Sequence, residues 1–235
     1  MSSAHRMTVN NLLIAALPDE EQQRFLAGCE KVGLKYADSL CEPGDSIRHV
    51  YFPENCSISL LAPAGGNARL EVGLIGHEGL LGAFLAFGVD VYPFKALVQG
   101  TGTALRMSGA RFRGELERCP ALQYGLKRYT YVLICQLAQM AACARFHVVE
   151  KRLARWLLMT QDRAHSDQFH MTHEFLASML GVRRVGVTKA ASALQQRELI
   201  HYSRGDIKIL DRNGLEAASC ECYHTDKAIY QRVFG

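Results

Sequence analysis

Residues 172–192 read THEFLASMLGVRRVGVTKAAS, and this stretch determines how the last third of the chain folds. Thr172 suits the N-cap of a short first helix, because its hydroxyl can accept a hydrogen bond from a free backbone amide of the first turn. Gly181 stands where the chain must turn sharply, and glycine reaches positive φ without a side-chain clash. Ala177 is small where a second helix has to cross closely, and Val187 points inward from that second helix. The spacing predicts two helices joined by a tight turn, a helix-turn-helix.

The outward face of the second helix is basic at its N-terminal end. The residues expected on this face are Arg183, Arg184, Val185, Thr188 and Lys189. In a helix-turn-helix this end enters the major groove of DNA, where an arginine fork matches the O6 and N7 acceptors of guanine. We therefore expect these residues, together with Thr172, to form a DNA contact. The alternative is a solvated basic face on an ordinary pair of helices.

A β-hairpin is expected directly after these helices. Leu199–His201 and Ile207–Leu210 alternate apolar with polar residues on either side of a glycine-containing turn that holds Arg204. Such a hairpin is a wing, and Arg204 at its tip can reach the DNA backbone. The charge distribution agrees, because residues 145–235 hold 14 Lys and Arg against 10 Asp and Glu, whereas residues 1–144 hold 13 of each.

A long helix precedes this module. A mostly apolar series recurs there at alternating steps of four and three, and His147 closes it: Leu122, Leu126, Tyr129, Leu133, Gln136, Met140, Cys143 and His147. This heptad pattern predicts a seam that pairs with a second copy of the chain, with Gln136 as the polar residue that fixes the register. The alternative is a core helix buried inside one subunit. A further helix, Val148–Arg163, is expected to bury Trp156 and to turn Arg152 and Arg155 toward water.

The N-terminal half has a different sequence pattern, with short helices followed by short strands. Two short helices are expected within residues 8–30, the second starting at Pro18-Asp19. Residues 32–107 then alternate short apolar stretches with Gly- and Pro-rich turns, which predicts a β-barrel or jelly roll with strands at Ser57–Leu61, Leu70–Ile75 and Ala96–Val98. The predicted fold class is α+β. Its parts are a β-roll with N-terminal helices (1–118), a dimerisation helix (119–147) and a winged helix-turn-helix (148–235).

The bulk composition is that of a globular protein, 49% hydrophobic and 21% charged. No apolar run is long enough to span a membrane and no secretory signal is evident, so we expect a cytoplasmic protein without a membrane contact. The eight cysteines show no disulfide or zinc-site spacing, and Cys220-Glu-Cys222 is their only close pair. We expect reduced thiols and no metal or cofactor; a redox or iron–sulfur role is the alternative.

The order of these parts resembles the plan of the cyclic-AMP receptor protein/FNR (CRP/FNR) family of transcription regulators. The resemblance covers nearly the whole chain and is most specific at residues 176–184 (LASMLGVRR) and 75–82 (IGHEGLLG). The second stretch is similar to the family's Gly-Glu-x-Gly loop, where the β-roll closes over an effector pocket. The residues that the resemblance assigns to such a pocket are Gly76, Glu78, Gly79, Leu80, Tyr92 and Lys95.

The chain also departs from the family's pattern. Family members that bind cyclic nucleotides pair the phosphate with an arginine shortly after this loop, followed by a small hydroxyl residue, but residues 86–94 (AFGVDVYPF) contain neither. Lys95 lacks the planar fork of arginine, so we expect an effector other than a cyclic nucleotide, or none. Cys29, Cys41 and Cys56 are spread too widely for the family's iron–sulfur sensors. Val185 stands where many members carry glutamate, which implies an altered DNA site, with valine against a thymine methyl.

The resemblance implies a homodimeric regulator that binds a pseudo-palindromic site on double-stranded DNA and contacts RNA polymerase. The alternative is a β-roll that senses a small ligand or a metal, with a basic tail that docks a protein partner. An enzyme of the cupin type is not expected. His49, His77 and Glu78 are present, but the spacing of its metal ligands is not.

Overall fold

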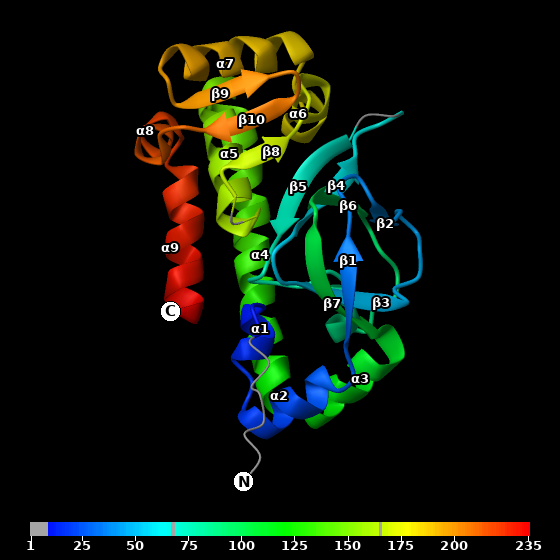
Figure 1. Cartoon of the computed structure of the whole chain (residues 1–235). Helices are drawn as coiled ribbons and strands as arrows, with labels where there is room; N and C mark the ends of the chain where they lie inside the picture. Colours follow the sequence, from blue (N-terminus) through cyan, green and yellow to red (C-terminus); the bar gives the residue numbers. More distant parts are fainter. Residues whose placement is uncertain (1–8, 67–68, 165) are drawn as a thin grey trace.

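The computed structural model describes residues 9–66, 69–164 and 166–235 (Figure 1). Two short helices open this part of the chain, α1 (Leu12–Ala15) and α2 (Asp19–Leu26). Asn11 caps α1 by accepting hydrogen bonds from the backbone amides of Leu13 and Ile14. Pro18 precedes α2, whose first turn carries three acidic residues that suit the positive end of a helix dipole. Both helices are where the sequence predicted them.

The predicted β-roll follows as two antiparallel sheets. The strands are β1 (Glu30–Leu34), β2 (Ser39–Cys41), β3 (His49–Pro53), β4 (Ser57–Pro63), β5 (Arg69–Ile75), β6 (Lys95–Gly100) and β7 (Gly102–Ser108). One sheet has the order β1-β7-β3 and the other β2-β6-β4-β5. A short 3-10 helix, η1 (Ala83–Phe87), lies between β5 and β6. The core between the sheets includes Val50, Phe52, Ile58 and Val98, all fully buried, so burial of apolar side chains holds the roll closed.

Helix α3 (Gly109–Arg118) leads from the β-roll into the long helix α4 (Pro120–Phe146). Leu122, Leu126 and Tyr129 of α4 belong to the same hydrophobic core as the β-roll. The last helix, α9 (Cys222–Phe234), returns from the C-terminal region and lies alongside α4 (Figure 1). Helix α4 therefore packs against the β-roll, against α9 and, near its start, against α1 and α3, while a further strip of its side chains stays exposed.

The residues predicted to form the dimer seam lie on the side of α4 that faces the chain's own core, so the predicted seam is wrong. Its residues Leu122, Leu126, Tyr129, Leu133 and Gln136 are each at most 8% exposed within a single chain. Met140 is partly buried and its sulfur accepts a hydrogen bond from Arg155 at 3.7 Å. The five buried side chains are covered inside the subunit and leave little surface for a second copy. The spacing does mark a buried stripe, but the stripe faces the chain's own core.

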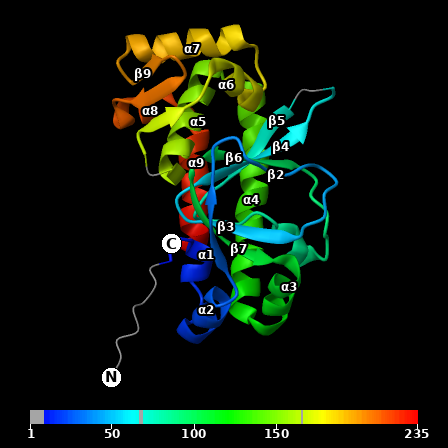
Figure 2. The same cartoon turned by 45° about the vertical axis from the view of Figure 1, so that its right-hand side comes forward.

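The C-terminal region begins with α5 (Val149–Ala164), which follows α4 after a short break at His147. The strands β8 (Gln168–His170), β9 (Ile200–Ser203) and β10 (Asp206–Ile209) form a small antiparallel sheet beside α6 (His173–Leu180), α7 (Arg184–Gln196) and α8 (Arg212–Ala218). A second core holds them together, with Leu157, Leu176, Val187, Leu194 and Leu215 completely buried. Turning the molecule shows α7 at the end opposite to α2 (Figure 2).

Two arginines of α5 do not face water as predicted. Arg155 is only 4% exposed and forms a buried ion pair with Asp226 of α9. Arg152 is half-buried and donates a hydrogen bond to the backbone carbonyl of Leu180 at the end of α6. The helical periodicity of the sequence predicted both on the polar side of α5. Arg155 is buried all the same because Asp226 of α9 pairs with its charge. In the described ranges, no helix combines the length and the apolar character that crossing a membrane requires.

Candidate DNA-binding surface and the sites around it

The turn between α6 and α7 has the predicted geometry. The Thr172 hydroxyl accepts a hydrogen bond from the backbone amide of Phe175 at 3.2 Å, so Thr172 caps α6. Gly181 ends α6 in the left-handed region at φ 61°, and a side-chain carbon there would lie 2.7 Å from Leu70 of β5. The turn requires glycine through its positive φ, and a larger residue would in addition displace the end of the Leu70 side chain.

The N-terminal end of α7 is basic and open. Arg183 is its N-cap, and Arg184, Val185, Thr188 and Lys189 are all exposed, Val185 by 59%. Neither arginine nor Lys189 forms an ion pair with any described residue. Their charge is therefore available to a partner that carries negative charge, and the positive end of the α7 dipole points the same way.

Thr188 connects α7 to its neighbours. Its hydroxyl lies 3.0 Å from Nδ1 of His173 at the start of α6, and the His173 ring stacks on Tyr202 of β9 with ring centroids 4.1 Å apart. Burial, and then the positive charge of Arg184, lower the pKa of His173. The lowered pKa favours the neutral imidazole, which contacts both Thr188 of α7 and Tyr202 of the wing.

The wing is a tight hairpin. Arg204 and Gly205 both adopt positive φ, 52° and 93°, which is the conformation of a two-residue type I′ turn between β9 and β10. The backbone amide of Tyr202 donates to the Gln195 side chain at 2.6 Å, which fixes the hairpin against the end of α7. Arg204 is exposed at the tip. The sequence did not predict β8, which adds a third strand by pairing with β10.

A buried polar cluster joins the β-roll to the C-terminal region. Glu71 of β5 is 1% exposed, and it accepts hydrogen bonds from Nε1 of Trp156 at 2.9 Å and from the Ser59 hydroxyl. Gln99 donates to Ser59 at 2.6 Å and contacts the sulfur of Met179 in α6. Burial raises the pKa of Glu71 to about 7, although the Ser59 and Trp156 hydrogen bonds act in the opposite direction. The cluster holds α5 and α6 against the outer face of the sheet.

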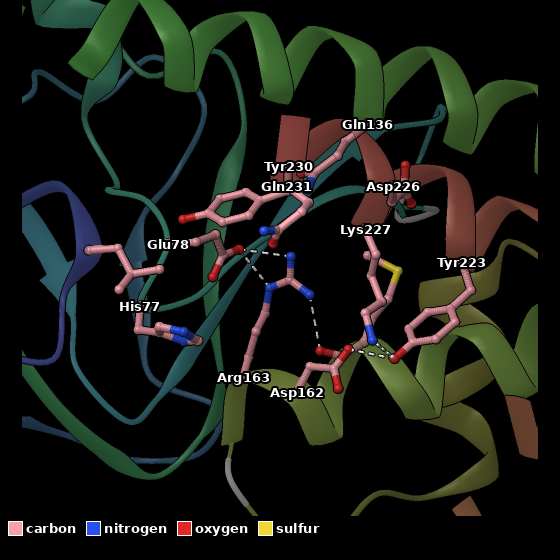
Figure 3. Close-up of a pocket in the computed structure, with 12 residues that line it drawn as sticks. His77, Glu78, Gln136, Asp162, Arg163, Tyr223, Asp226, Lys227, Tyr230 and Gln231 are labelled. Carbon is pink, nitrogen blue, oxygen red and sulfur yellow. Dashed lines mark hydrogen bonds and ion pairs between the residues drawn. The ribbon is translucent and has the colours of Figure 1, made fainter. Parts of the chain in front are cut away.

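The loop that resembles Gly-Glu-x-Gly does not build an effector pocket inside the β-roll. Glu78 forms a buried ion pair with Arg163 of α5, at 2.8 Å to Nε and 2.7 Å to NH2 (Figure 3). Its carboxylate also accepts a hydrogen bond from the Gly76 amide at 3.2 Å. Leu80 is buried in the core, and a side-chain carbon at Gly79 would clash with the Tyr129 hydroxyl. Tyr129 of α4 therefore fills the space beside the loop.

Tyr92 and Lys95 lie elsewhere. The Tyr92 hydroxyl donates to the His49 carbonyl at 2.9 Å, and the residue lines a separate hollow with Arg48 and Asp45. Lys95 pairs with the exposed Glu42. The six pocket residues thus do not converge, and the prediction that they form one site is wrong. The prediction grouped residues that are close to the loop in the sequence. In the structure, Glu78 pairs instead with Arg163, 85 positions later in the chain.

A cavity lies beside the ion pair between Glu78 and Arg163 (Figure 3). It has a volume of about 280 Å³ and lies between the Glu78 loop, α5 and α9. Asp162, Lys227 and Tyr230 also line it, and the Tyr223 hydroxyl donates to Asp162 at 2.8 Å. Neither α9 nor this cavity was predicted, since neither has a local sequence signal comparable to the helix-turn-helix.

Four metal-ligating side chains from distant parts of the sequence also come together. Cys143 and His147, at the end of α4, meet Cys220 and Cys222, which lie between α8 and the first turn of α9. The potential ligand atoms all lie within 4.8 Å of one another. The sequence did not predict this group. Two short spacings could have signalled it, Cys-x3-His on a helix and Cys-x-Cys, but the two pairs are more than 70 residues apart.

Comparison with known proteins gives a consistent picture. Residues 151–218 match the family model of the Crp-like helix-turn-helix domain. The c-di-GMP-responsive global regulator CLP of Xanthomonas campestris has 18% sequence identity and a TM-score of 0.66, over 82% of this chain and 99% of that one. A putative CRP/FNR-family regulator from Eubacterium rectale has 14% identity and a TM-score of 0.67, over 88% and 96%. A CRP-family regulator from Thermus thermophilus has 15% identity and a TM-score of 0.67, over 80% and 96%. Among curated protein sequences none matches.

Two of these neighbours are described as transcriptional regulators, and the third as a global regulator linked to gene expression. The turn at Gly181, the open basic end of α7 and the wing are the features that a helix-turn-helix uses on DNA. The chain therefore has the fold of CRP/FNR-family transcription regulators and carries their Crp-like helix-turn-helix domain.

Proposed function

We propose that this chain is a homodimeric, sequence-specific DNA-binding regulator that acts in the cytoplasm. The observation that carries the proposal is the end of α7, where Arg183, Arg184 and Lys189 are exposed without an acidic partner among the described residues. Arg184 has the planar fork that matches guanine, and Val185 offers a methyl group to thymine. We assign Arg204 on the wing and Thr172, both exposed, to contacts with the phosphate backbone.

The dimer would form through a face of α4 that the chain leaves open, which we call the outer face. It consists of Tyr124, Lys127, Tyr131, Ile134, Ala138, Ala141 and Arg145, which follow one another at heptad steps. Tyr124, Tyr131 and Ile134 are 64%, 56% and 59% exposed, a large apolar exposure for one helix. Pairing of two outer faces would bury them and would set the two α7 helices about 34 Å apart, one turn of DNA.

The proposal divides the chain into the three segments that the sequence suggested. Residues 1–118 would form the effector-type β-roll, residues 119–147 the dimerisation helix, and residues 148–235 the DNA-binding region. No cyclic nucleotide is proposed as effector, because Tyr129 occupies the space beside the Gly79 loop and Glu78 is neutralised by Arg163. RNA polymerase is the proposed downstream partner, since a regulator bound at a promoter acts through it.

Selection of preferred DNA sequences, followed by binding measurements at a fixed salt concentration, tests the proposal. Arg184→Ala should weaken binding to the selected site by roughly 5- to 150-fold, the range of about 1–3 kcal/mol for one bidentate base contact. Arg113→Ala is the matched control, because Arg113 is also exposed but lies on α3, next to the β-roll. Equal affinity of the Arg184→Ala and Arg113→Ala variants would overturn the assignment of α7.

A further inference from the structure

The geometry points to a structural metal site at the junction of α4 and α5, in which Cys143, His147, Cys220 and Cys222 bind one zinc ion. We call these four residues the Cys3His cluster. Three thiolates and one imidazole are a ligand set that Zn²⁺ prefers in structural sites. None of the four side chains lies on the proposed DNA-binding surface, so the site stands independently of that function.

The distances fit a single tetrahedral ion. The sulfurs of Cys143 and Cys220 lie 3.5 Å apart, and Nδ1 of His147 lies 3.4 Å from the sulfur of Cys222. Bonds of about 2.3 Å to sulfur and about 2.0 Å to nitrogen give tetrahedral edges of about 3.8 Å between two sulfurs and about 3.5 Å between sulfur and nitrogen. All four donor atoms fall within 4.8 Å of one another, so small side-chain adjustments complete the tetrahedron.

The surroundings also suit such a centre. Cys143, Cys220 and Cys222 are 2%, 3% and 2% exposed and form a small cluster apart from both main cores. Gln139 donates a hydrogen bond to the sulfur of Cys222 at 3.0 Å, which is the kind of contact that orients a thiolate ligand. A zinc ion with three thiolates carries one net negative charge. Arg152 of α5 interacts electrostatically with Cys143 and Cys220 and can compensate it, and Arg155, whose main partner is Asp226, lies near the same two cysteines.

A zinc ion explains why all four side chains of the Cys3His cluster come together. Thiol packing, a disulfide or an iron–sulfur cluster would each explain only part of this. Buried thiols can pack as small apolar groups, but that does not explain a histidine nitrogen directed at one of the sulfurs. A disulfide would use two of the cysteines and leave the third cysteine and His147 without a role. An iron–sulfur cluster places several irons between its ligands and needs them further apart than a single ion does.

The position of the cluster gives the ion a structural role. His147 ends α4 in an extended conformation, φ −111° and ψ 142°, just before α5 begins at Val149. Cys220 and Cys222 lie on either side of the turn that leads into α9. An ion held by all four would therefore fix the α4–α5 junction to the α8–α9 junction.

Metal analysis of the untagged protein, purified without chelator and under reducing conditions, tests the inference. We expect about one zinc per chain, and loss of most of it in Cys143→Ser, His147→Ala and Cys220→Ser. Cys135→Ser, on the same helix but outside the cluster, should keep its zinc. His147→Cys should keep it as well, because a four-cysteine site also binds zinc.

A second measurement does not depend on the variants folding. Stripping the metal from the wild-type protein with a chelator and adding Co²⁺ should give the visible absorption of tetrahedral cobalt with thiolate ligands, at about one equivalent per chain. Retention of zinc by all the cluster variants would overturn the inference. So would a metal-free wild-type protein that gives no tetrahedral cobalt spectrum, or a Cys143–Cys220 disulfide found by mass spectrometry in the reduced preparation.

Discussion

Glu71 should make the stability of this protein fall as the pH rises toward neutrality. Its carboxyl group is 1% exposed between β5 and α5, and burial raises its pKa to about 7 from the ordinary value of 4.5. The folded state therefore binds the proton more tightly than the unfolded state does. Between about pH 4.5 and about pH 7, unfolding releases a proton, so the free energy of unfolding decreases with rising pH. A shift of about 2.5 units corresponds to about 3 kcal/mol.

The variant Glu71→Gln isolates this effect. Its amide oxygen can still accept the hydrogen bond from Trp156 Nε1, but the side chain no longer ionises. We expect the variant to exceed the wild type in stability by up to about 3 kcal/mol near pH 8, and by much less near pH 5. Using the difference between the two proteins removes the contribution of every other titrating group.

Urea unfolding at several pH values measures this directly. Trp156 is the only tryptophan in the chain and lies against Glu71, so its fluorescence reports on the relevant interface. A constant difference between the two proteins across the pH range would show that Glu71 does not titrate in this way. A wild type that gains stability relative to Glu71→Gln as the pH rises would also rule out a raised pKa, because that is the sign expected of a carboxylate with a lowered pKa.

Three further predictions concern the rest of the molecule. Ile134→Asp should convert the proposed dimer into a monomer in light scattering, because a charge replaces an exposed apolar side chain in the outer face; a dimer that persists would exclude this face. Arg163→Met should lower the free energy of unfolding by about 3–5 kcal/mol, since Glu78 stays buried without its partner, and adding Glu78→Gln should recover part of the loss. If the double variant recovers nothing, the ion pair is not the cause. Arg204→Ala should weaken binding to all DNA sequences alike. The slope of the logarithm of the binding constant against the logarithm of the salt concentration should fall in magnitude by about one. A change in the preferred DNA sequence would mean that the wing contacts bases.

The parts of the fold with local signals could be predicted from the sequence. Thr172 and Gly181 mark the ends of α6 through their own backbone chemistry, and the structure confirms both. The turn at Arg204 and Gly205 likewise follows from a short stretch with glycine. Strand β8 was missed because three residues carry too little pattern, and it exists only through its pairing with β10.

Features that depend on distant partners could not be predicted in the same way. The heptad spacing at Leu126, Leu133 and their neighbours correctly indicates burial, but periodicity cannot distinguish the chain's own core from a second copy. Glu78 has the local sequence of an effector loop, and its actual partner Arg163 is 85 positions away. The Cys3His cluster combines two short spacings that only the return of α9 along α4 brings together (Figure 1).

If α7 reads DNA as one of a symmetric pair, a hydroxyl-radical footprint on the selected DNA site will show both members of the pair at once. We expect two protected segments whose centres lie about one helical turn, roughly 10 base pairs, apart. Arg184→Ala should lose both segments together, and Arg113→Ala should keep both. A single protected segment, or a footprint that Arg184→Ala leaves unchanged, would contradict the proposed mode of binding.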